Sequence, residues 1–136
     1  MEVDWEALRA AAREAQTHAY APYSHYLVGA AAVTEDGRVF TGCNTENATY
    51  GGGLCAEGGL VSALTLGGGG RLRAFVCYGN PAADLQGAGV PTVTVPCGRC
   101  RQLLREHAGA DFEIEMPTGV RPFAEILPDS FGPEFL

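Results

Sequence analysis

The stretch LVGAAAV at residues 27–33 is an unbroken apolar run in the first third of the chain. Such a run is typical of a buried strand, and its small residues indicate that another element packs closely against it. The tetrapeptide EDGR at 35–38 contains the Asp-Gly signal of a tight hairpin turn. Residues 39–44 are therefore expected to return as the antiparallel neighbour of the buried strand.

Helical and strand-like segments alternate along the rest of the chain. Asp4 is placed to cap a first amphipathic helix that ends near Thr17, and the glycines at 67–70 end a second helix that begins at Cys55. The later segments are an apolar strand at 72–78, an extended stretch at 92–95, a helix at 98–107, an alternating strand at 112–116 and a short helix at 122–127. The alternation favours one sheet sandwiched by helices, in a single domain of residues 1–136.

The amino-acid composition limits which kinds of molecule the protein is expected to bind. The chain has 136 residues, of which 46% are hydrophobic and 18% charged, as in ordinary soluble globular proteins. Its net charge is −7, and all nine basic residues are Arg. Because binding to a nucleic-acid backbone requires a basic surface, this balance argues against a nucleic-acid partner. A small nucleoside carries no phosphate and stays compatible with the charge.

The sequence indicates a cytoplasmic protein. The charged segment 1–16 lacks the apolar core of a signal peptide, and the longest apolar run, 27–33, is too short to cross a membrane. In that compartment the five cysteines are expected to be reduced, so metal binding or catalysis is favoured over disulfides. Cys43 and Cys77 lie in apolar strand-like runs and are expected to be packed thiols.

The remaining three cysteines form two motifs that suit a reactive zinc ion. Cys97 and Cys100 are separated by two residues, and Cys55 is followed after one residue by Glu57. Three thiolates leave one tetrahedral position open for water, which distinguishes a catalytic zinc from a structural one. A neighbouring carboxylate can then move the proton of that water. The pattern predicts hydrolysis.

Two other interpretations of the CxxC pair, redox chemistry and structural zinc, are less favoured. A redox pair belongs after a strand in a thioredoxin-like unit and has no use for a third cysteine. A structural zinc needs a fourth ligand, but His107 lies seven residues beyond Cys100, and His18 and His25 are expected at the surface. In the expected fold Cys55 and the CxxC pair each open a helix, where free N–H groups and the helix dipole favour thiolates.

These motifs resemble the small three-cysteine cytidine deaminases of the cytidine/deoxycytidylate deaminase superfamily. The similarity extends over nearly the full length, through AYAPYSHYLVGAA at 19–31, GCNTENATY at 42–50, CAE at 55–57, PCGRCRQ at 96–102 and ILPDSF at 126–131. The resemblance implies an α/β fold, a three-layer α/β/α sandwich around a mixed five-stranded sheet. It also implies a homotetramer with shared active sites.

The resemblance assigns a role to each site residue. Cys55, Cys97 and Cys100 would bind one zinc ion per chain, with Glu57 as the catalytic proton shuttle. Asn44 and Glu46 would hydrogen-bond the ribose hydroxyls, and Tyr26 would stack on the pyrimidine. The N–H of Ala56 and the carbonyl of Val95 would contact the amide edge and the amine of the base. Phe131 would reach into the site of a neighbouring subunit.

One position departs from the family pattern. Many three-cysteine relatives have Arg immediately after the catalytic Glu, where it offsets the thiolate charge, but this chain has Gly58. We hypothesise that the helix N-termini, together with Arg99, provide the compensation. Tyr26 is a second departure, since relatives commonly have Phe there, and its hydroxyl is expected to need a partner.

The expected reaction is hydrolytic deamination of cytidine and 2′-deoxycytidine to uridine and 2′-deoxyuridine, with release of ammonia, in pyrimidine salvage. A blasticidin-S-type deaminase shares the cysteine motifs, but its substrate lacks an ordinary ribose and would not need Glu46. A polynucleotide editor is disfavoured by the net charge of −7. The non-enzymatic alternative is a structural zinc module for protein interaction, which predicts a closed metal site.

Overall fold

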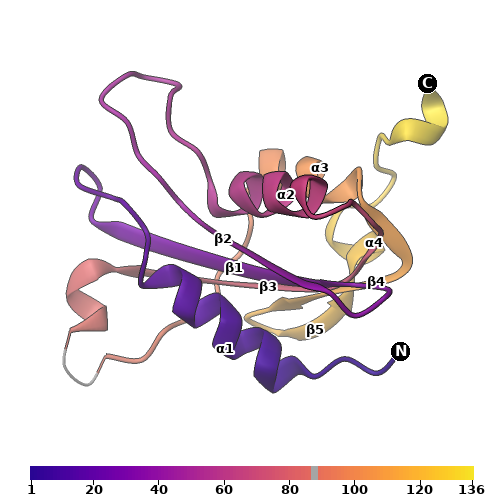
Figure 1. The fold of residues 1–136 in the computed structure, drawn as a ribbon, viewed down its shortest axis with the longest axis horizontal. Coiled ribbons are helices and arrows are strands. Elements are labelled where there is room, and N and C mark those ends of the chain that lie inside the picture. The colour runs from indigo at the N-terminus through magenta and orange to yellow at the C-terminus, as the bar shows by residue number, and fades with distance from the viewer. Residues whose placement is uncertain (87–88) are drawn as a thin grey trace.

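The computed structural model describes residues 1–86 and 89–136, and its centre is a five-stranded sheet. The strands are β1 (Tyr26–Thr34), β2 (Val39–Cys43), β3 (Leu72–Pro81), β4 (Ala108–Met116) and β5 (Gly119–Pro122). Their order is β2-β1-β3-β4-β5 (Figure 1). Only the β3–β4 pair is parallel, and the other three pairs are antiparallel. The sheet is mixed, as the resemblance implied.

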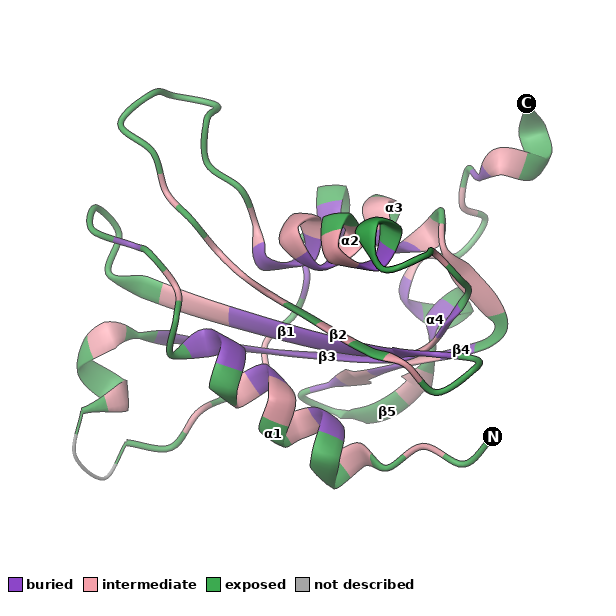
Figure 2. Ribbon diagram, in the orientation of Figure 1, coloured by how far each residue is buried: buried purple, intermediate pink, exposed green. Residues whose placement is uncertain are grey.

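Helices cover both faces of the sheet. Helix α1 (Trp5–Gln16) lies on one face, and the other is covered by α2 (Ala56–Leu66), α3 (Gly98–Arg105) and α4 (Phe123–Ile126) (Figure 1). Alternate residues of a strand point to opposite faces. Accordingly Ala31 packs in the α1 cluster, whereas Ala30 packs in the cluster under α2. Burial is concentrated in β1 and β3 (Figure 2). The three-layer α/β/α sandwich is confirmed.

The small residues of β1 are explained by α1. A Cβ atom at Gly29 would stand 2.3 Å from the carbonyl oxygen of Ala12 and 2.2 Å from the backbone nitrogen of Gln16. Helix and strand backbones therefore touch at this point, and only glycine permits it. The helix begins where expected, because Asp4 accepts the N–H of Ala7 at 3.1 Å.

A second close approach positions the start of α2. A Cβ atom at Gly42 in β2 would stand 2.3 Å from the carbonyl oxygen of Ala56 and 2.6 Å from the nitrogen of Leu60. The first turn of α2 thus rests directly on the strand backbone. This contact fixes the helix end from which the first cysteine motif projects.

Several element boundaries differ from the sequence prediction. Strand β5 was not assigned, because its four residues include Gly and Pro and show no alternation. The stretch 92–95 forms only one isolated bridge, between Val93 and Tyr78. Helix α3 ends at Arg105, two residues before the expected end at His107, and β4 begins at Ala108, four residues before the expected start at Phe112. In the 80–89 loop, a 3-10 helix follows β3, and residues 87–88 lie outside the described part.

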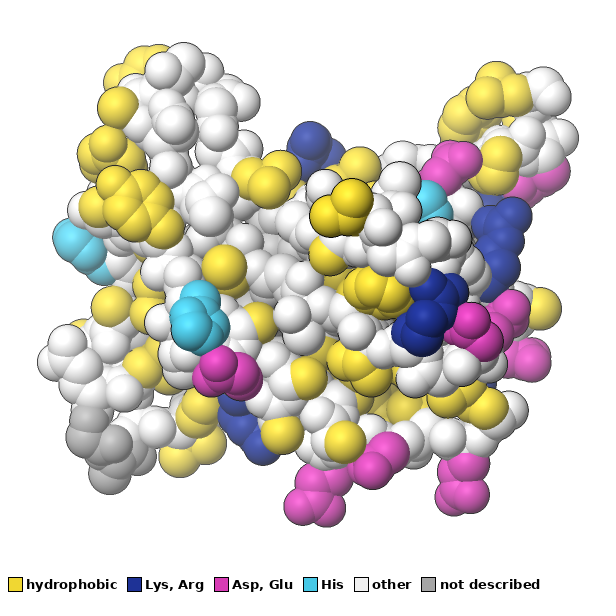
Figure 3. Space-filling model, in the orientation of Figure 1, with side chains coloured by type: hydrophobic (Ala, Val, Ile, Leu, Met, Phe, Trp, Pro, Cys, Tyr) yellow, Lys and Arg dark blue, Asp and Glu magenta, His cyan; other side chains and the backbone are white. Residues whose placement is uncertain are grey.

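Two segments project on the α2 side of the sandwich. One is the connection between β2 and α2, and the other is the C-terminal tail after α4, which ends in a 3-10 turn (Figure 1). Hydrophobic side chains are exposed on both, among them Tyr50, Phe131 and Phe135 (Figure 3). Within the described ranges, no helix has the length and apolar character needed to cross a membrane.

Candidate active site and metal centre

The first cysteine motif is held at the N-terminus of α2. Cys55 has an extended backbone and caps the helix, and its sulfur accepts the N–H of Gly58 at 3.3 Å. Glu57 follows in the first turn and is only 5% exposed. A carboxylate this deeply buried requires polar or charged neighbours.

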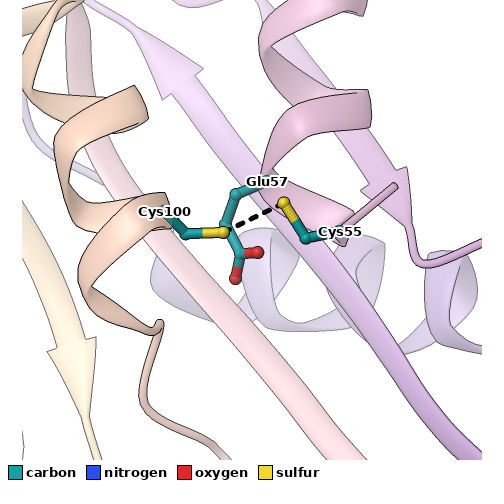
Figure 4. A group of neighbouring side chains, drawn as sticks. All are labelled: Cys55, Glu57 and Cys100. Atoms are coloured by element: carbon teal, nitrogen blue, oxygen red, sulfur yellow. Dashed lines mark hydrogen bonds between the residues drawn. The ribbon is translucent and has the colours of Figure 1, made fainter. Parts of the chain in front are cut away.

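The second motif brings a sulfur to that carboxylate from α3. Cys100 lies in the first turn of α3, is 1% exposed, and donates to the sulfur of Cys55 at 3.0 Å. The ligand atoms of Cys55, Glu57 and Cys100 all lie within 4.8 Å of one another, and the side chains converge between the two helix ends (Figure 4). The predicted catalytic carboxylate and two predicted ligands are therefore adjacent.

The third predicted ligand, Cys97, lies outside this tight group. It caps α3, is exposed, and lines the same cavity as the other two cysteines. The backbone N–H of Cys100 lowers the pKa of the Cys97 thiol. The Cys97 thiol is therefore easier to ionise than an ordinary cysteine.

The donor set suits a zinc ion. Burial, together with hydrogen bonds to Cys55 and Glu57, raises the pKa of the Cys100 thiol well above its ordinary value. A thiolate at this position therefore needs a positive charge beside it, which a bound cation supplies. Three sulfur donors with a nearby carboxylate match a soft, tetrahedral zinc site that keeps one position for a non-protein ligand.

Arg99, the residue hypothesised to offset the thiolate charge, lies beside the sulfur of Cys55. Its Nη1 atom donates to the sulfur of Cys55 at 3.6 Å, and its side chain is exposed. A Cβ atom built at Gly58 would stand 3.3 Å from the same sulfur and 3.0 Å from Leu54 Cδ1. The guanidinium thus approaches the sulfur from α3, whereas α2 has glycine at position 58.

A cavity of about 340 Å³ opens in front of the cysteines and Glu57. This volume lies in the range of small-molecule sites. Its wall contains all the predicted site residues except Phe131: Tyr26, Asn44, Glu46, Cys55, Ala56, Glu57, Val95, Cys97 and Cys100. Segments from four parts of the chain therefore form one site.

Asn44 and Glu46 are held by hydrogen bonds to the backbone at and just before the start of β1. Asn44 accepts the N–H of Val28 at 2.8 Å and donates to the carbonyl of Tyr26 at 2.9 Å. Between the two, Thr45 pairs on both sides, with Tyr20 and with Leu54. Since residues two apart in an extended segment share a side, Asn44 and Glu46 both face the cavity.

Tyr26 lies over a glycine of the neighbouring strand. A Cβ atom at Gly79 would stand 2.7 Å from the Tyr26 hydroxyl and 3.0 Å from Thr94 Cγ2. Gly79 is opposite Val28 in the β1–β3 register, which places it diagonally from Tyr26 on the same face. Tyr26 as a whole is 39% exposed and lines the cavity. Its hydroxyl rests against the backbone of β3, and the expected polar partner is not among its contacts in the described residues.

Phe131 is placed apart from this cavity. It lies in the projecting tail, is 57% exposed, and stacks on Phe135 at a centroid distance of 5.9 Å. Gln102 of α3 donates to its carbonyl at 2.9 Å, which anchors the tail. Its predicted contact is with another subunit, so its role stays a prediction.

Four residues near the site were not singled out from the sequence as functional: Ser24, Cys77, Gly79 and Thr94. Cys77 is fully buried. Burial raises the pKa of its thiol well above the ordinary value, with a further contribution from the negative charge of Glu57. The packed thiol expected there thus lies beside the predicted catalytic carboxylate, Glu57. Only the pairing of β1 with β3 places Cys77 and Gly79 under the cavity.

A larger hollow of about 610 Å³ lies beside β4 and α4. Its two arginines are already engaged: Arg73 forms an ion pair with Glu113 at 2.8 Å, and Arg105 forms one with Glu134 and also donates to Ser130 at 2.7 Å. Since both cations already have carboxylate partners, the cysteine-lined cavity is the better candidate for chemistry.

The sequence is similar to a family of zinc-binding deaminases, which agrees with a metal site at the cysteines. The family model described as "Cytidine and deoxycytidylate deaminase zinc-binding region" matches residues 1–114. A curated cytidine deaminase from Mycobacterium tuberculosis is 50% identical over 131 residues, which cover 96% of this chain and 92% of that protein.

Solved structures resemble the whole fold. The crystal structure of cytidine deaminase from Mycobacterium tuberculosis has a TM-score of 0.83 at 49% identity, covering 96% of this chain and 99% of that one. The cytidine deaminase from Mycobacterium leprae has a TM-score of 0.82 at 45% identity, covering 94% and 100%.

Proposed function

The chain belongs to the cytidine and deoxycytidylate deaminase family, and from that premise we propose that it hydrolyses cytidine and 2′-deoxycytidine to uridine and 2′-deoxyuridine with release of ammonia. The observation that carries the proposal is the convergence of Cys55, Glu57 and Cys100 within 4.8 Å, in a cavity that Asn44 and Glu46 also line.

Cys55, Cys97 and Cys100 would hold one zinc ion per chain. When bound, zinc acts as a Lewis acid and makes water available as a nucleophile near neutral pH. The N-termini of α2 and α3 point their free N–H groups at the sulfurs and favour the thiolate forms. Arg99 adds a positive charge at the sulfur of Cys55.

Glu57 is proposed to move the protons of the reaction. Its carboxylate takes a proton from the attacking water, delivers it to N3 of the pyrimidine, and later helps to protonate the departing amine. The water oxygen becomes the new carbonyl oxygen of the product, so one water is consumed for each ammonia released. Burial beside the sulfurs suits this role, because a water-poor site strengthens the coupling between carboxylate and substrate.

The cavity wall supplies the contacts for the nucleoside. Tyr26 would stack on the pyrimidine, while the N–H of Ala56 and the carbonyl of Val95 would contact the base edge. For the sugar, the Asn44 amide has one N–H and one lone pair left beyond its contacts with β1. Glu46 adds a carboxylate acceptor. A donor–acceptor pair beside a carboxylate complements two adjacent hydroxyls.

We also propose a homotetramer with shared active sites in the cytoplasm, serving pyrimidine salvage. Support comes from the exposed aromatic residues of the projecting tail, Phe131 and Phe135, which are available to enter a neighbouring subunit. The five cysteines are free thiols, which suits a reducing compartment. Sedimentation of the purified protein tests the assembly.

The deciding experiment follows uridine and ammonia during incubation with cytidine, with a zinc count on the same sample. Equal amounts of uridine and ammonia and one zinc per chain are expected. Blasticidin S, measured in parallel by loss of ultraviolet absorbance, is expected to react much more slowly. Preferential turnover of blasticidin S would replace the cytidine assignment, and no turnover of either compound with zinc bound would favour a structural module.

A further inference from the structure

The turn before β1 places the Ser24 hydroxyl between two predicted substrate contacts. Ser24 Oγ accepts the backbone N–H of Tyr26 at 3.0 Å and donates its own hydrogen to Oε2 of Glu46. One hydroxyl therefore connects the strand that carries the aromatic residue to the carboxylate proposed to bind the sugar. Because it acts as donor and acceptor at once, its orientation is determined.

The same turn occupies most of the acceptor capacity of Glu46. Oε1 accepts the backbone N–H groups of Tyr23 and Ser24, each at 3.0 Å, and Oε2 accepts the hydroxyl of Ser24. A carboxylate has about four acceptor positions, so these three donors leave one, on Oε2. The hydrogen bonds from Ser24 also lower the pKa of Glu46, which keeps this acceptor ionised.

The turn itself is anchored at both ends. His25 has a left-handed backbone with φ of 57°, its N–H donates to the carbonyl of Ala21 at 3.0 Å, and its carbonyl accepts the N–H of Ala82 at 2.6 Å. Glu46 is tied to the preceding segment by its own N–H, which donates to Tyr20 at 2.8 Å. Both partners of the Ser24–Glu46 hydrogen bond therefore stand on backbone that other hydrogen bonds also hold, and the donated hydrogen of the hydroxyl sets the position of the carboxylate.

We propose that Ser24 is a positioning residue for sugar recognition, which holds Glu46 so that a single acceptor site on Oε2 is presented to one ribose hydroxyl. The inference rests on the proposed function, because it requires Glu46 to contact the sugar. Without the Ser24 hydroxyl, the carboxylate keeps its two backbone donors at Oε1 but is free to rotate about them. The cost falls on substrate binding, since the reacting atoms of the base lie elsewhere in the cavity.

Ser24→Ala tests this, because both backbone donors to Glu46 remain and water can replace the hydroxyl as acceptor of the exposed Tyr26 N–H. KM for cytidine should rise roughly three- to tenfold, the size of an ordinary hydrogen bond, because the carboxylate itself remains, while kcat stays within about twofold because binding is lost uniformly. Ser24→Thr keeps a hydroxyl and should restore KM. Ser62→Ala, at an exposed position in the middle of α2, is the matched control and should leave KM unchanged.

A double-substitution cycle separates this role from a structural one. In a Glu46→Gln background, Ser24→Ala should give no further rise in KM. An equal rise in both backgrounds, or a loss of kcat that Ser24→Thr does not restore, would overturn the inference. If Glu46→Gln leaves KM unchanged while the wild type deaminates cytidine, the sugar contact and this inference both fail, but the deaminase proposal survives. Only a wild type inactive on cytidine would overturn that proposal.

Discussion

Arg99 Nη1 lies 3.6 Å from the sulfur of Cys55, across 44 residues of sequence. The contact joins the two cysteine motifs, and position 58, next to Glu57, is a glycine that supplies no charge. Three thiolates with a divalent zinc carry a net negative charge, so a nearby guanidinium should strengthen the site.

Arg99→Ala should therefore release zinc faster. Groups that hydrogen-bond metal ligands typically change metal affinity by 10–100-fold, and because Arg99 is exposed, about tenfold is expected. The measurement is the rate of zinc transfer to a chromogenic chelator, with Arg121→Ala as a control far along the sequence, in β5. If wild type and Arg99→Ala release zinc at the same rate, the thiolate charge is offset by the helix N-termini alone.

Cys97→Ser should lower the zinc content well below one per chain, although Cys97 stands outside the tight Cys55–Glu57–Cys100 group. A serine hydroxyl is a poor zinc ligand at neutral pH, so two sulfurs would remain. Cys43→Ser is the control, because Cys43 is a half-buried thiol at the end of β2 and should leave zinc content unchanged. Elemental analysis of the dialysed proteins gives the answer, and full zinc in Cys97→Ser would remove Cys97 from the ligand set.

Glu57→Gln should keep its zinc and lose most turnover. The amide has nearly the same shape but cannot accept and deliver the proton, and loss of one acid–base group typically costs on the order of 10²–10⁴ in rate. Single-turnover kinetics with cytidine and a zinc count on the same preparation test this. Near-wild-type turnover would mean that another group moves the proton.

Gly79→Ala should disturb Tyr26, since the added methyl group would stand 2.7 Å from the tyrosine hydroxyl. The ring is then pushed towards the base position, and we expect kcat/KM for cytidine to fall on the order of tenfold. Tyr26→Phe removes the nearest clash and should recover part of the loss in the double variant. If Tyr26→Phe gives no recovery, the effect of Gly79→Ala arises from its contact with Thr94 instead.

Two glycine substitutions should affect stability in opposite directions. Gly29→Ala forces apart the backbones of β1 and α1, whose atoms would stand 2.2–2.6 Å from the new Cβ, and should cost about 3 kcal/mol of unfolding free energy. Gly59→Ala in α2 meets only ordinary contacts, the nearest at 3.7 Å. It should be neutral or add up to about 1 kcal/mol from helix propensity. Denaturant unfolding of both variants measures the difference.

The hairpin of β1 and β2, the start of α1 and the end of α2 could be predicted because their signals are local. An apolar run, an Asp-Gly turn, the Asp4 cap and the glycines after Leu66 act within a few residues of where they stand. Strand β5 had no such signal. It exists because β4 offers an edge for pairing, from Glu113 to Met116. The candidate metal ligands could also be predicted from the sequence, since residue type and spacing alone point to cysteine thiolates.

The sequence by itself determined which residues can do chemistry, the cysteines and Glu57, and roughly which helices they open. Tertiary structure decided which of them meet. Four contacts join residues that are at least 22 positions apart in the sequence. They are the 3.0 Å contact of Cys100 with Cys55, the contact of Arg99 with the same sulfur, the packing of Tyr26 against Gly79, and the hydrogen bond from Ser24 to Glu46. Such contacts follow from strand register and helix packing, which side-chain spacing along the chain does not encode.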